Sequence, residues 1–259
     1  MSVVKTSRTP STRLTGQTFF LKSFKTAMTN PSEPPRSHIT KIKKSVMKIP
    51  LWRLTTARRK ILEGLGIRRF SRPAYGNLES FLAKHLPTEG FFVEAGGVDG
   101  FFESNTYHLE RFSNWRGILI EPVPEMCARI KTNRKKSKAV NAALVSNEYA
   151  SNKVFISPNH AMTSVSSEDT PGRIAVPART LTSIFDTLQC PPIDFMSLDV
   201  EGFEAEALRG LNLSKYKPKF FLIECLNQDS RDKITTLLSP HYELVECPTH
   251  RDLFFRASN

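Results

Sequence analysis

Long apolar runs are missing from this chain of 259 residues. No stretch approaches the roughly 20 apolar residues that a membrane-spanning helix needs, so we expect no transmembrane segment. Cysteine is also scarce, and Cys127, Cys190, Cys225 and Cys247 form neither a Cys-x-x-Cys pair nor a metal-binding spacing with histidine. These absences predict free thiols in a reducing compartment rather than a disulfide framework or a Cys/His metal site.

Acidic residues are almost absent from the first 62 positions, which hold 14 Lys and Arg but a single acid, Glu33. The rest of the chain holds 23 basic and 24 acidic residues, so the net charge of +12 belongs to the leader. A leader of Ser, Thr, Lys and Arg interrupted by prolines is typical of a disordered arm or an organelle transit peptide. We therefore expect residues 1–50 to be a disordered leader, with a mitochondrial or plastid location if it is a transit peptide and a cytoplasmic one otherwise.

Attraction to nucleic acid or anionic lipid is the other use of such a basic arm. No aromatic platform or base-reading motif accompanies it, so sequence-specific nucleic-acid binding is not expected. Residues 51–89 form a separate helical segment in this interpretation. Its apolar residues from 51 to 65 follow one stripe beside the basic positions 58–60, which predicts either the first helix of the fold or a basic amphipathic surface segment, and a second helix is expected at about 77–86.

From Gly90 onward, short apolar runs alternate with helical segments, which predicts an α/β fold with a parallel sheet. Strands are expected at 91–95, 117–121, 139–145, 193–198 and 220–224, with helices at 104–112, 124–131 and 201–209. The segments 241–246 and 252–256 predict an antiparallel pair at one edge. Residues 147–177 show weak periodicity and are expected to form a long, partly functional loop.

Carboxylates stand at the ends of four predicted strands, namely Glu94, Glu121, Asp199 and Glu224. Because ligands of open α/β sheets bind beyond the carboxyl ends of the strands, these side chains should meet at one crevice. An acid in the position of Glu121 can accept the hydroxyls of an adenosine ribose. Asp199 and Glu201 also stand where a helix should begin, so hydrogen bonding to the first helix amides is an alternative role for them.

Glycines follow the first strand in Glu94-Ala-Gly-Gly-Val-Asp-Gly100. The dinucleotide spacing Gly-x-Gly-x-x-Gly fails there, which disfavours a nucleotide-dependent oxidoreductase. A tight turn explains the glycines but not Glu94. The segment is instead similar to the loop of class I S-adenosylmethionine-dependent methyltransferases, whose cofactor is cationic around its methionine end.

Further motifs resemble one family in its own order from about Gly90 to Asn227. They are Phe92-Val-Glu-Ala-Gly-Gly-Val-Asp-Gly100, Ser104-Asn-Thr106, Trp115-Arg-Gly-Ile-Leu-Ile-Glu-Pro122, Asn141-Ala-Ala143 and Asp194-Phe-Met-Ser-Leu-Asp-Val-Glu-Gly-Phe-Glu204. Together they resemble the FkbM-type methyltransferases, and most closely their eukaryotic branch, in which Ala usually stands at the position of Gly97. The resemblance implies a class I, Rossmann-like fold over residues 90–259, with a mostly parallel seven-stranded sheet, helices on both faces and a C-terminal antiparallel edge hairpin.

The same resemblance implies transfer of a methyl group from S-adenosylmethionine to a hydroxyl of a sugar or small metabolite. The cofactor-binding residues that it implies lie in the glycine loop and at the strand ends, namely Glu94, Gly96, Gly97, Gly100, Asn105, Glu121, Asn141 and Ala142. Asp199 is the expected general base, a role typically worth about 10²- to 10⁴-fold in rate. Glu201 would share the proton or bind acceptor hydroxyls, and Glu224 and Asn227 would line the far side of the acceptor site.

Three alternatives stay open on the sequence alone. His160 could act as the base, because the loop that holds it can cover the pocket. Asp199, Glu201 and Glu224 could instead hold a divalent metal such as Mg²⁺, which prefers oxygen ligands. A non-catalytic trafficking or interaction protein with the same fold is the alternative from another functional class. It is disfavoured because the acids and glycines of the expected cofactor site are retained.

Overall fold

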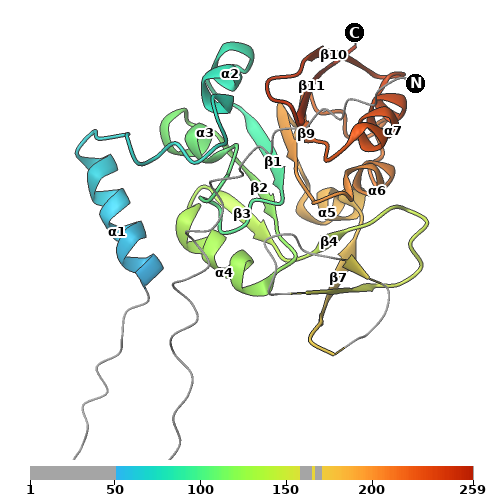
Figure 1. The fold of residues 1–259 in the computed structure, drawn as a ribbon, viewed down its shortest axis with the longest axis horizontal. Coiled ribbons are helices and arrows are strands. Elements are labelled where there is room, and N and C mark those ends of the chain that lie inside the picture. Colours follow the sequence, from blue (N-terminus) through green and yellow to red (C-terminus); the bar gives the residue numbers. More distant parts are fainter. Residues whose placement is uncertain (1–50, 158–164, 167–170, 259) are drawn as a thin grey trace, which may run out of the picture. The chain divides into compact units, whose positions relative to one another are not determined.

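The computed structural model describes residues 51–157, 165–166 and 171–258 (Figure 1). The chain divides into two units, of which residues 1–48 lie outside the described part and residues 49–259 form the domain considered below. The prediction of a disordered leader over residues 1–50 therefore falls outside the described residues. Within the described residues, no helix combines the length and the apolar content needed to cross a membrane.

A seven-stranded sheet forms the centre of the domain, with the order β3-β2-β1-β8-β9-β11-β10. Its strands are β1 (Phe91–Ala95), β2 (Arg116–Ile120), β3 (Ser137–Val140), β8 (Phe195–Leu198), β9 (Phe220–Glu224), β10 (Tyr242–Glu246) and β11 (Asp252–Ala257). The strands from β3 to β9 pair in parallel, whereas β11 runs antiparallel to both β9 and β10. The predicted mostly parallel seven-stranded sheet with a C-terminal antiparallel hairpin is confirmed.

Both faces of this sheet are buried, which explains why its central strands are continuous apolar runs. Alternate residues of a strand point to opposite faces, so Val93 and Phe92 belong to two different hydrophobic cores. Helices cover each face (Figure 1), and they are α2 (Leu78–His85), α3 (Tyr107–Phe112), α4 (Pro124–Asn133), α5 (Leu181–Leu188), α6 (Glu204–Arg209) and α7 (Gln228–Leu238). The described side chains of α1 (Leu51–Gly64) belong to neither of the two cores. Helices α2 to α4 pack in the core that contains Phe92, and α5 to α7 pack in the core that contains Val93. The sheet is thus sandwiched, and only its strand ends are open to ligands.

The prediction of a long loop over residues 147–177 is wrong for much of its length. Strands β5 (Lys153–Ile156) and β7 (Ile174–Arg179) pair there, together with β4 (Ala143–Leu144) and β6 (Val165–Ser166), in a second sheet of order β4-β7-β5-β6. Val154, Ile156 and Val176 form its small core. The main pairing of this second sheet joins β5 and β7, which lie about twenty residues apart in the sequence. The local pattern of either strand is too short to reveal that pairing.

Three further features of the fold differ from the sequence-based prediction. The single strand expected at 139–145 is two strands, β3 and β4, which belong to different sheets and are separated at Asn141. Helices α5 and α7 were not predicted, and α7 begins with a capping box formed by Asn227 and Ser230. Helix α6 begins at Glu204 rather than at 201. All four cysteines are free, as expected.

Candidate active site

The turn from Asp199 to Gly202 joins β8 to α6 and determines which acid binds the free amides there. Glu201 and Gly202 have φ values of 55° and 96°, so the chain cannot be helical before Glu204. The Glu204 carboxylate accepts hydrogen bonds from the amides of Val200 and Gly202, both at 3.0 Å. Glu204 therefore holds the turn that precedes α6. The N-cap residue of this helix is Phe203, which makes no side-chain cap hydrogen bond, so neither Asp199 nor Glu201 has the capping role that the sequence offered to them. The unusual φ of Glu201 is the kind of local strain that concentrates at functional sites.

Asp199 has a carboxyl group that retains its proton near neutral pH. It lies at the end of β8 and hydrogen-bonds to the carboxylate of Glu224, at the end of the neighbouring strand β9. Burial raises the pKa of Asp199 to about 9, and the negative charges of Glu224, Glu201 and Glu204 contribute to the same rise. Burial, followed by the charge of Glu224, also raises the pKa of Glu201. The structure thus brings Asp199, Glu201 and Glu224 together in one acidic cluster.

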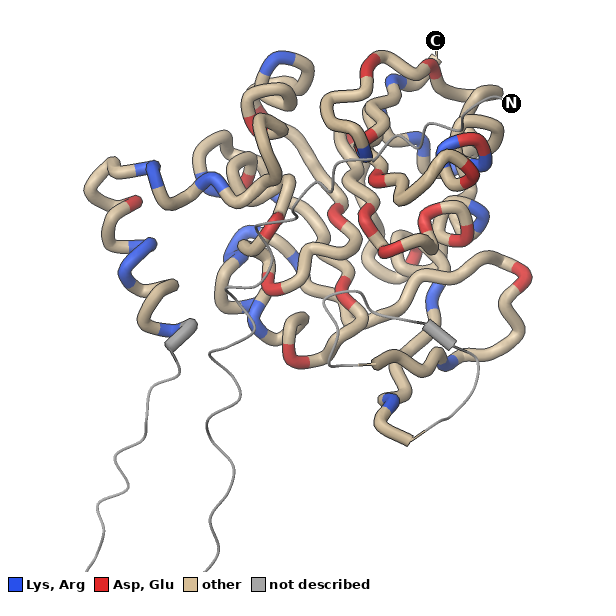
Figure 2. The backbone as a smooth tube through the Cα atoms, viewed as in Figure 1, with Lys and Arg blue, Asp and Glu red and all other residues tan. Residues whose placement is uncertain are grey.

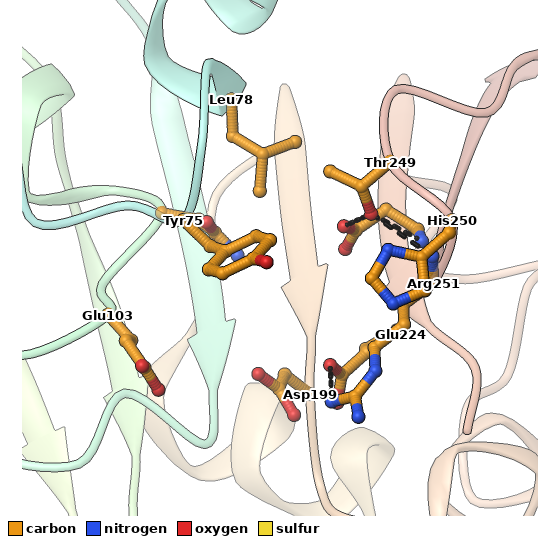
Figure 3. Close-up of a pocket in the computed structure, with 10 residues that line it drawn as sticks. Tyr75, Leu78, Glu103, Asp199, Glu224, Thr249, His250 and Arg251 are labelled. Atoms are coloured by element: carbon orange, nitrogen blue, oxygen red, sulfur yellow. Dashed lines mark hydrogen bonds and ion pairs between the residues drawn. The ribbon is translucent and has the colours of Figure 1, made fainter. Parts of the chain in front are cut away.

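A pocket of about 280 Å³ opens beside Asp199. Figure 3 shows Tyr75 and Glu103 on one side and Thr249, His250 and Arg251 on the other, with Asp199 between them. The remaining lining residues are Leu78, Asn105, Glu224 and Asp252. One wall thus comes from the turn between β10 and β11.

Sequence reasoning missed Tyr75 and the wall formed by residues 249–252. The Arg251 guanidinium lies 3.2 Å from the Glu224 carboxylate, and Asp252 pairs with Glu224 in the register of β11 on β9. Knowledge of how β11 pairs with β9 would have placed residue 251 beside the crevice. This pairing cannot be deduced from the sequence of either strand alone.

Glu121 lies at the end of β2 and is buried, with 5% of its surface exposed. Burial raises its pKa to about 7, although hydrogen bonds from the amides of Val123 and Val98 work in the opposite direction. The Asn141 side chain donates to the carbonyls of Glu121 and Pro122, at 2.9 and 2.8 Å, and so holds this turn in place. Ala142 is completely buried in the core, so its methyl group presents no surface to a ligand.

Gly96 allows the end of β1 to approach the end of β8. A Cβ atom at this position would lie 1.6 Å from the carbonyl oxygen of Asp199, and the φ of Gly96 is +88°. Only glycine avoids both the clash and the strain. Gly97 faces Leu119 and Glu94, and Gly100 packs against Arg134, so the loop is closely packed against the protein itself.

Glu94 holds the loop that follows β1 and the adjacent segment 104–106. One carboxylate oxygen accepts from the amides of Asn105 and Thr106, and the other accepts from the hydroxyls of Ser104 and Thr106 and from Arg134. Asn105 is held from a second side, because its side-chain amide donates to the Ser197 hydroxyl at 3.1 Å. The described contacts of Glu94 are all with protein, and direct binding of the cofactor by Glu94 stays a prediction.

Arg134 is a buried cation that the sequence analysis did not single out. Its side chain is fully buried and forms ion pairs with Glu110, at 2.9 Å, and with Glu94, at 3.4 Å. The remaining guanidinium nitrogens donate to the carbonyls of Gly100 and Thr106 and to the hydroxyls of Ser104 and Thr106. These hydrogen bonds and ion pairs of Arg134 connect the glycine loop to α3 and α4.

Comparison with known proteins identifies the family. A model of the methyltransferase FkbM domain matches residues 94–254. The chain belongs to the FkbM methyltransferase family. It is therefore an S-adenosylmethionine-dependent methyltransferase. No curated protein matches it.

Several solved methyltransferases resemble this FkbM domain in fold. A putative caffeoyl-CoA O-methyltransferase from Staphylococcus aureus is 9% identical, covers 81% of this chain and 97% of its own, and has a TM-score of 0.45. An O-methyltransferase from Bacillus cereus in complex with SAH is 10% identical, with coverage of 79% and 91% and a TM-score of 0.42. Aeropyrum pernix fibrillarin with natively bound S-adenosyl-L-methionine is 14% identical, with coverage of 67% and 69% and a TM-score of 0.41. Similarity at this level concerns the fold and says nothing about the substrate.

The carboxyl groups at the strand ends of the FkbM domain suit a cationic cofactor such as S-adenosylmethionine. The cofactor carries positive charge at its methionine end, and the cluster of Asp199, Glu201 and Glu224 offers carboxyl groups whose ionised form a bound cation would favour. Buried Glu121 stands apart from this cluster, and its binding of ribose hydroxyls stays a prediction. A phosphate-bearing cofactor would instead require basic groups or a free helix N-terminus at these positions.

One residue predicted to act on the acceptor lies outside this constellation, and a second falls outside the described residues. Asn227 is exposed and accepts from the amide of Ser230, so it caps α7 and does not line the pocket. His160 lies outside the described residues. In the part of the FkbM domain that the structure describes, no group of three or more His, Cys, Asp or Glu side chains is arranged to hold a metal ion.

The substitution Gly96→Ala is expected to lower the free energy of unfolding by more than about 2 kcal/mol. The new methyl group would displace the Asp199 carbonyl, and the positive φ would strain an alanine backbone. Gly172 is the matched control because it has the same φ, +88°, but no atom lies within 4 Å of the place that a methyl group would take there. Gly172→Ala should therefore cost only about 1 kcal/mol. Urea unfolding of the two variants compares them. Equal losses would show that the contact with Asp199 is unimportant.

Proposed function

We propose that this FkbM methyltransferase transfers the methyl group of S-adenosylmethionine to a hydroxyl oxygen of a sugar or small metabolite. The observation that carries this proposal is the half-buried Asp199 side chain, which lines a pocket of about 280 Å³ at the point where Gly96 packs against the Asp199 backbone carbonyl. That volume is near the lower end of ligand pockets and suits a single small acceptor. The polar lining residues Tyr75, Thr249 and His250 offer both hydrogen-bond donors and acceptors to its hydroxyls.

Asp199 has the central chemical role in this proposal. When bound, S-adenosylmethionine supplies an electrophilic methyl group. The acceptor hydroxyl loses its proton to the Asp199 carboxylate as its oxygen becomes the nucleophile, and Glu224 and Glu201 receive hydrogen bonds from the protonated Asp199 or from further hydroxyls. The ion pair between Arg251 and Glu224 holds Glu224 beside Asp199. Tyr75 and the 249–252 wall orient the acceptor, and such orientation supplies much of the rate acceleration.

Affinity for S-adenosylmethionine is expected to rise with pH up to about pH 9. The pKa of Asp199 is raised to about 9 without the cofactor, so at neutral pH this carboxyl is protonated. A bound cation favours the carboxylate and releases that proton, and linkage then increases the affinity by up to about tenfold per pH unit below the raised pKa. Calorimetric titration in two buffers with different ionisation enthalpies counts the protons released.

The control for this pH dependence is Asp199→Asn, which cannot release the proton. Its affinity should resemble that of the wild type at low pH and stay constant as the pH rises. An affinity of the wild type that is independent of pH would contradict the assignment of the raised pKa to Asp199.

A panel of acceptors tests the proposed function itself. The full chain is incubated with S-adenosylmethionine and individual sugars or small alcohols, formation of S-adenosylhomocysteine is followed, and the product is analysed for an O-methyl group. Methylation of amines or carbon atoms alone would contradict O-methyl transfer. Failure of the folded protein to bind S-adenosylmethionine would instead favour the non-catalytic alternative.

A further inference from the structure

Helix α1 packs on the domain through its charged face. The Arg59 guanidinium lies over the ring of Phe101, 3.4 Å from its centroid, and its neighbour Lys60 donates to the carbonyl of Thr132 at 2.9 Å. One turn later, Glu63 accepts hydrogen bonds from Tyr107 and Arg111, both at 2.7 Å. Arg59 and Glu63 are both buried. Polar contacts, not an apolar stripe, therefore attach this helix.

The opposite face of α1 is apolar and exposed. Leu54 is 51% exposed, Ile61 64%, and Leu65, just after the helix, 71%. Spacings of seven and four residues place these three side chains on one side of a helix. The exposed apolar surface continues along the chain with Ile67 and Phe70, which are 44% and 49% exposed. A helix on a globular domain normally turns its apolar stripe inward, so the orientation of α1 is inverted.

Basic residues surround this apolar face. Apart from Arg59 and Lys60, which face the domain, the chain carries five of them between residues 53 and 72, namely Arg53, Arg58, Arg68, Arg69 and Arg72, and the only acid in this stretch is Glu63. Glu63 is buried and paired, so it presents no negative charge outward. The guanidinium groups of Arg58 and Arg69 lie 5.6 and 5.8 Å from the Phe70 ring centroid. Figure 2 shows the basic positions along this helix.

We propose that the exposed face of residues 54–70 binds the surface of an anionic membrane. An interfacial helix with aliphatic residues on one side and Lys or Arg flanking them is bound by burial of the apolar side chains and by attraction to acidic lipid headgroups. Each basic residue near such a surface adds to the attraction.

Other occupants of this face fit its charge or its shape less well. Residues 1–50 carry ten Lys and Arg against one acid, so the leader has the same sign of charge as the face. A second copy of the chain would bring its own basic residues against it. Nucleic acid would match the charge but would leave the aliphatic stripe of Leu54, Ile61 and Leu65 exposed, since it is bound through phosphates and stacked bases.

Vesicle sedimentation of the full chain tests the proposal. The wild type should bind vesicles of phosphatidylcholine mixed with phosphatidylserine, bind phosphatidylcholine alone much more weakly, and lose affinity as salt is raised. The variant Leu54→Ser/Ile61→Ser/Leu65→Ser should bind the acidic vesicles at least about tenfold more weakly. Its melting temperature should stay unchanged, because all three side chains are exposed. Leu244→Ser is the matched control, since Leu244 is 45% exposed on β10 and outside this face.

Equal vesicle binding by the wild type and the triple variant would overturn the proposal, because it would assign the binding to the basic leader that both contain. Absence of binding to acidic vesicles by the wild type would overturn it as well. So would a triple variant that keeps vesicle binding but loses self-association or binding to duplex DNA, since those results would assign the face to a second copy or to nucleic acid.

Discussion

Replacement of Asp199 by asparagine is expected to lower methyl transfer by about 10²- to 10⁴-fold, the usual contribution of a general base. Asparagine preserves the shape of the side chain and its packing beside Glu224, but it cannot accept a proton from the acceptor hydroxyl. At neutral pH it also resembles the protonated Asp199 of the cofactor-free protein, whose pKa is raised to about 9. The variant cannot supply the carboxylate that a bound cation favours, so its affinity for S-adenosylmethionine at pH 7 should be lower than that of the wild type, and the fall in kcat is measured at saturating cofactor.

Glu206→Gln is the control for this experiment. Glu206 lies on α6, shortly after the Asp199 turn, but its side chain is partly exposed and pairs with Arg209. Its replacement should leave turnover unchanged. If Asp199→Asn retained full turnover, Asp199 would be excluded as the base, and Glu201 and His160 would be the next residues to replace. Loss of cofactor binding in Asp199→Asn would instead show that the negative charge is needed for binding.

Replacement of Arg134 by methionine is expected to reduce the free energy of unfolding by about 3–5 kcal/mol. Methionine fills a similar volume, so the loss measures charge and hydrogen bonding more than packing. Glu94 and Glu110 would stay buried without their cation, with 3% and 8% of their side chains exposed. The glycine loop would also lose the hydrogen bond from Arg134 to the carbonyl of Gly100. Urea unfolding with a fitted m-value measures the change.

The matched control is Arg209→Met, which removes a partly exposed ion pair with Glu206. Surface pairs of this kind contribute about 1 kcal/mol or less, so this variant should be nearly as stable as the wild type. Combining Arg134→Met with Glu94→Gln should restore part of the lost stability, because it removes one of the uncompensated charges. A loss below about 1 kcal/mol in Arg134→Met would refute the importance of the buried pairs.

Local patterns were sufficient to predict the central sheet and the meeting of Asp199 with Glu224, but Glu94 pairs with Arg134 and does not line the pocket beside them. The runs around Val93, Ile118 and Met196 are apolar because both of their faces are buried, and that requirement is visible in a few consecutive residues. The acids at the strand ends follow from the same pattern, since a polar residue is tolerated only where the strand leaves the core. Asp199 and Glu224 accordingly lie together, as the order of the parallel strands requires.

Features that depend on pairing across long sequence distances were not predictable in this way. The pocket wall at 249–252 exists because β11 pairs with β9 in one particular register, and the second sheet exists because β7 pairs with β5. The roles of the acids before α6 were not predictable for a different reason. Asp199, Glu201 and Glu204 stand close together, and the left-handed φ values at 201 and 202 form a turn in which the amides of Val200 and Gly202 donate to Glu204.

The position of β11 between β9 and β10 constrains the order in which the protein can fold. Strand β10 precedes β11 in the chain, yet it reaches the sheet only through β11. The two strands are joined by a short turn, so they can form a hairpin early and add to β9 as one unit. The turn of that hairpin carries Thr249, His250 and Arg251. A polypeptide in which the hairpin has not yet added can have a complete glycine loop, but its pocket beside Asp199 stays open on the side that Thr249, His250 and Arg251 would close.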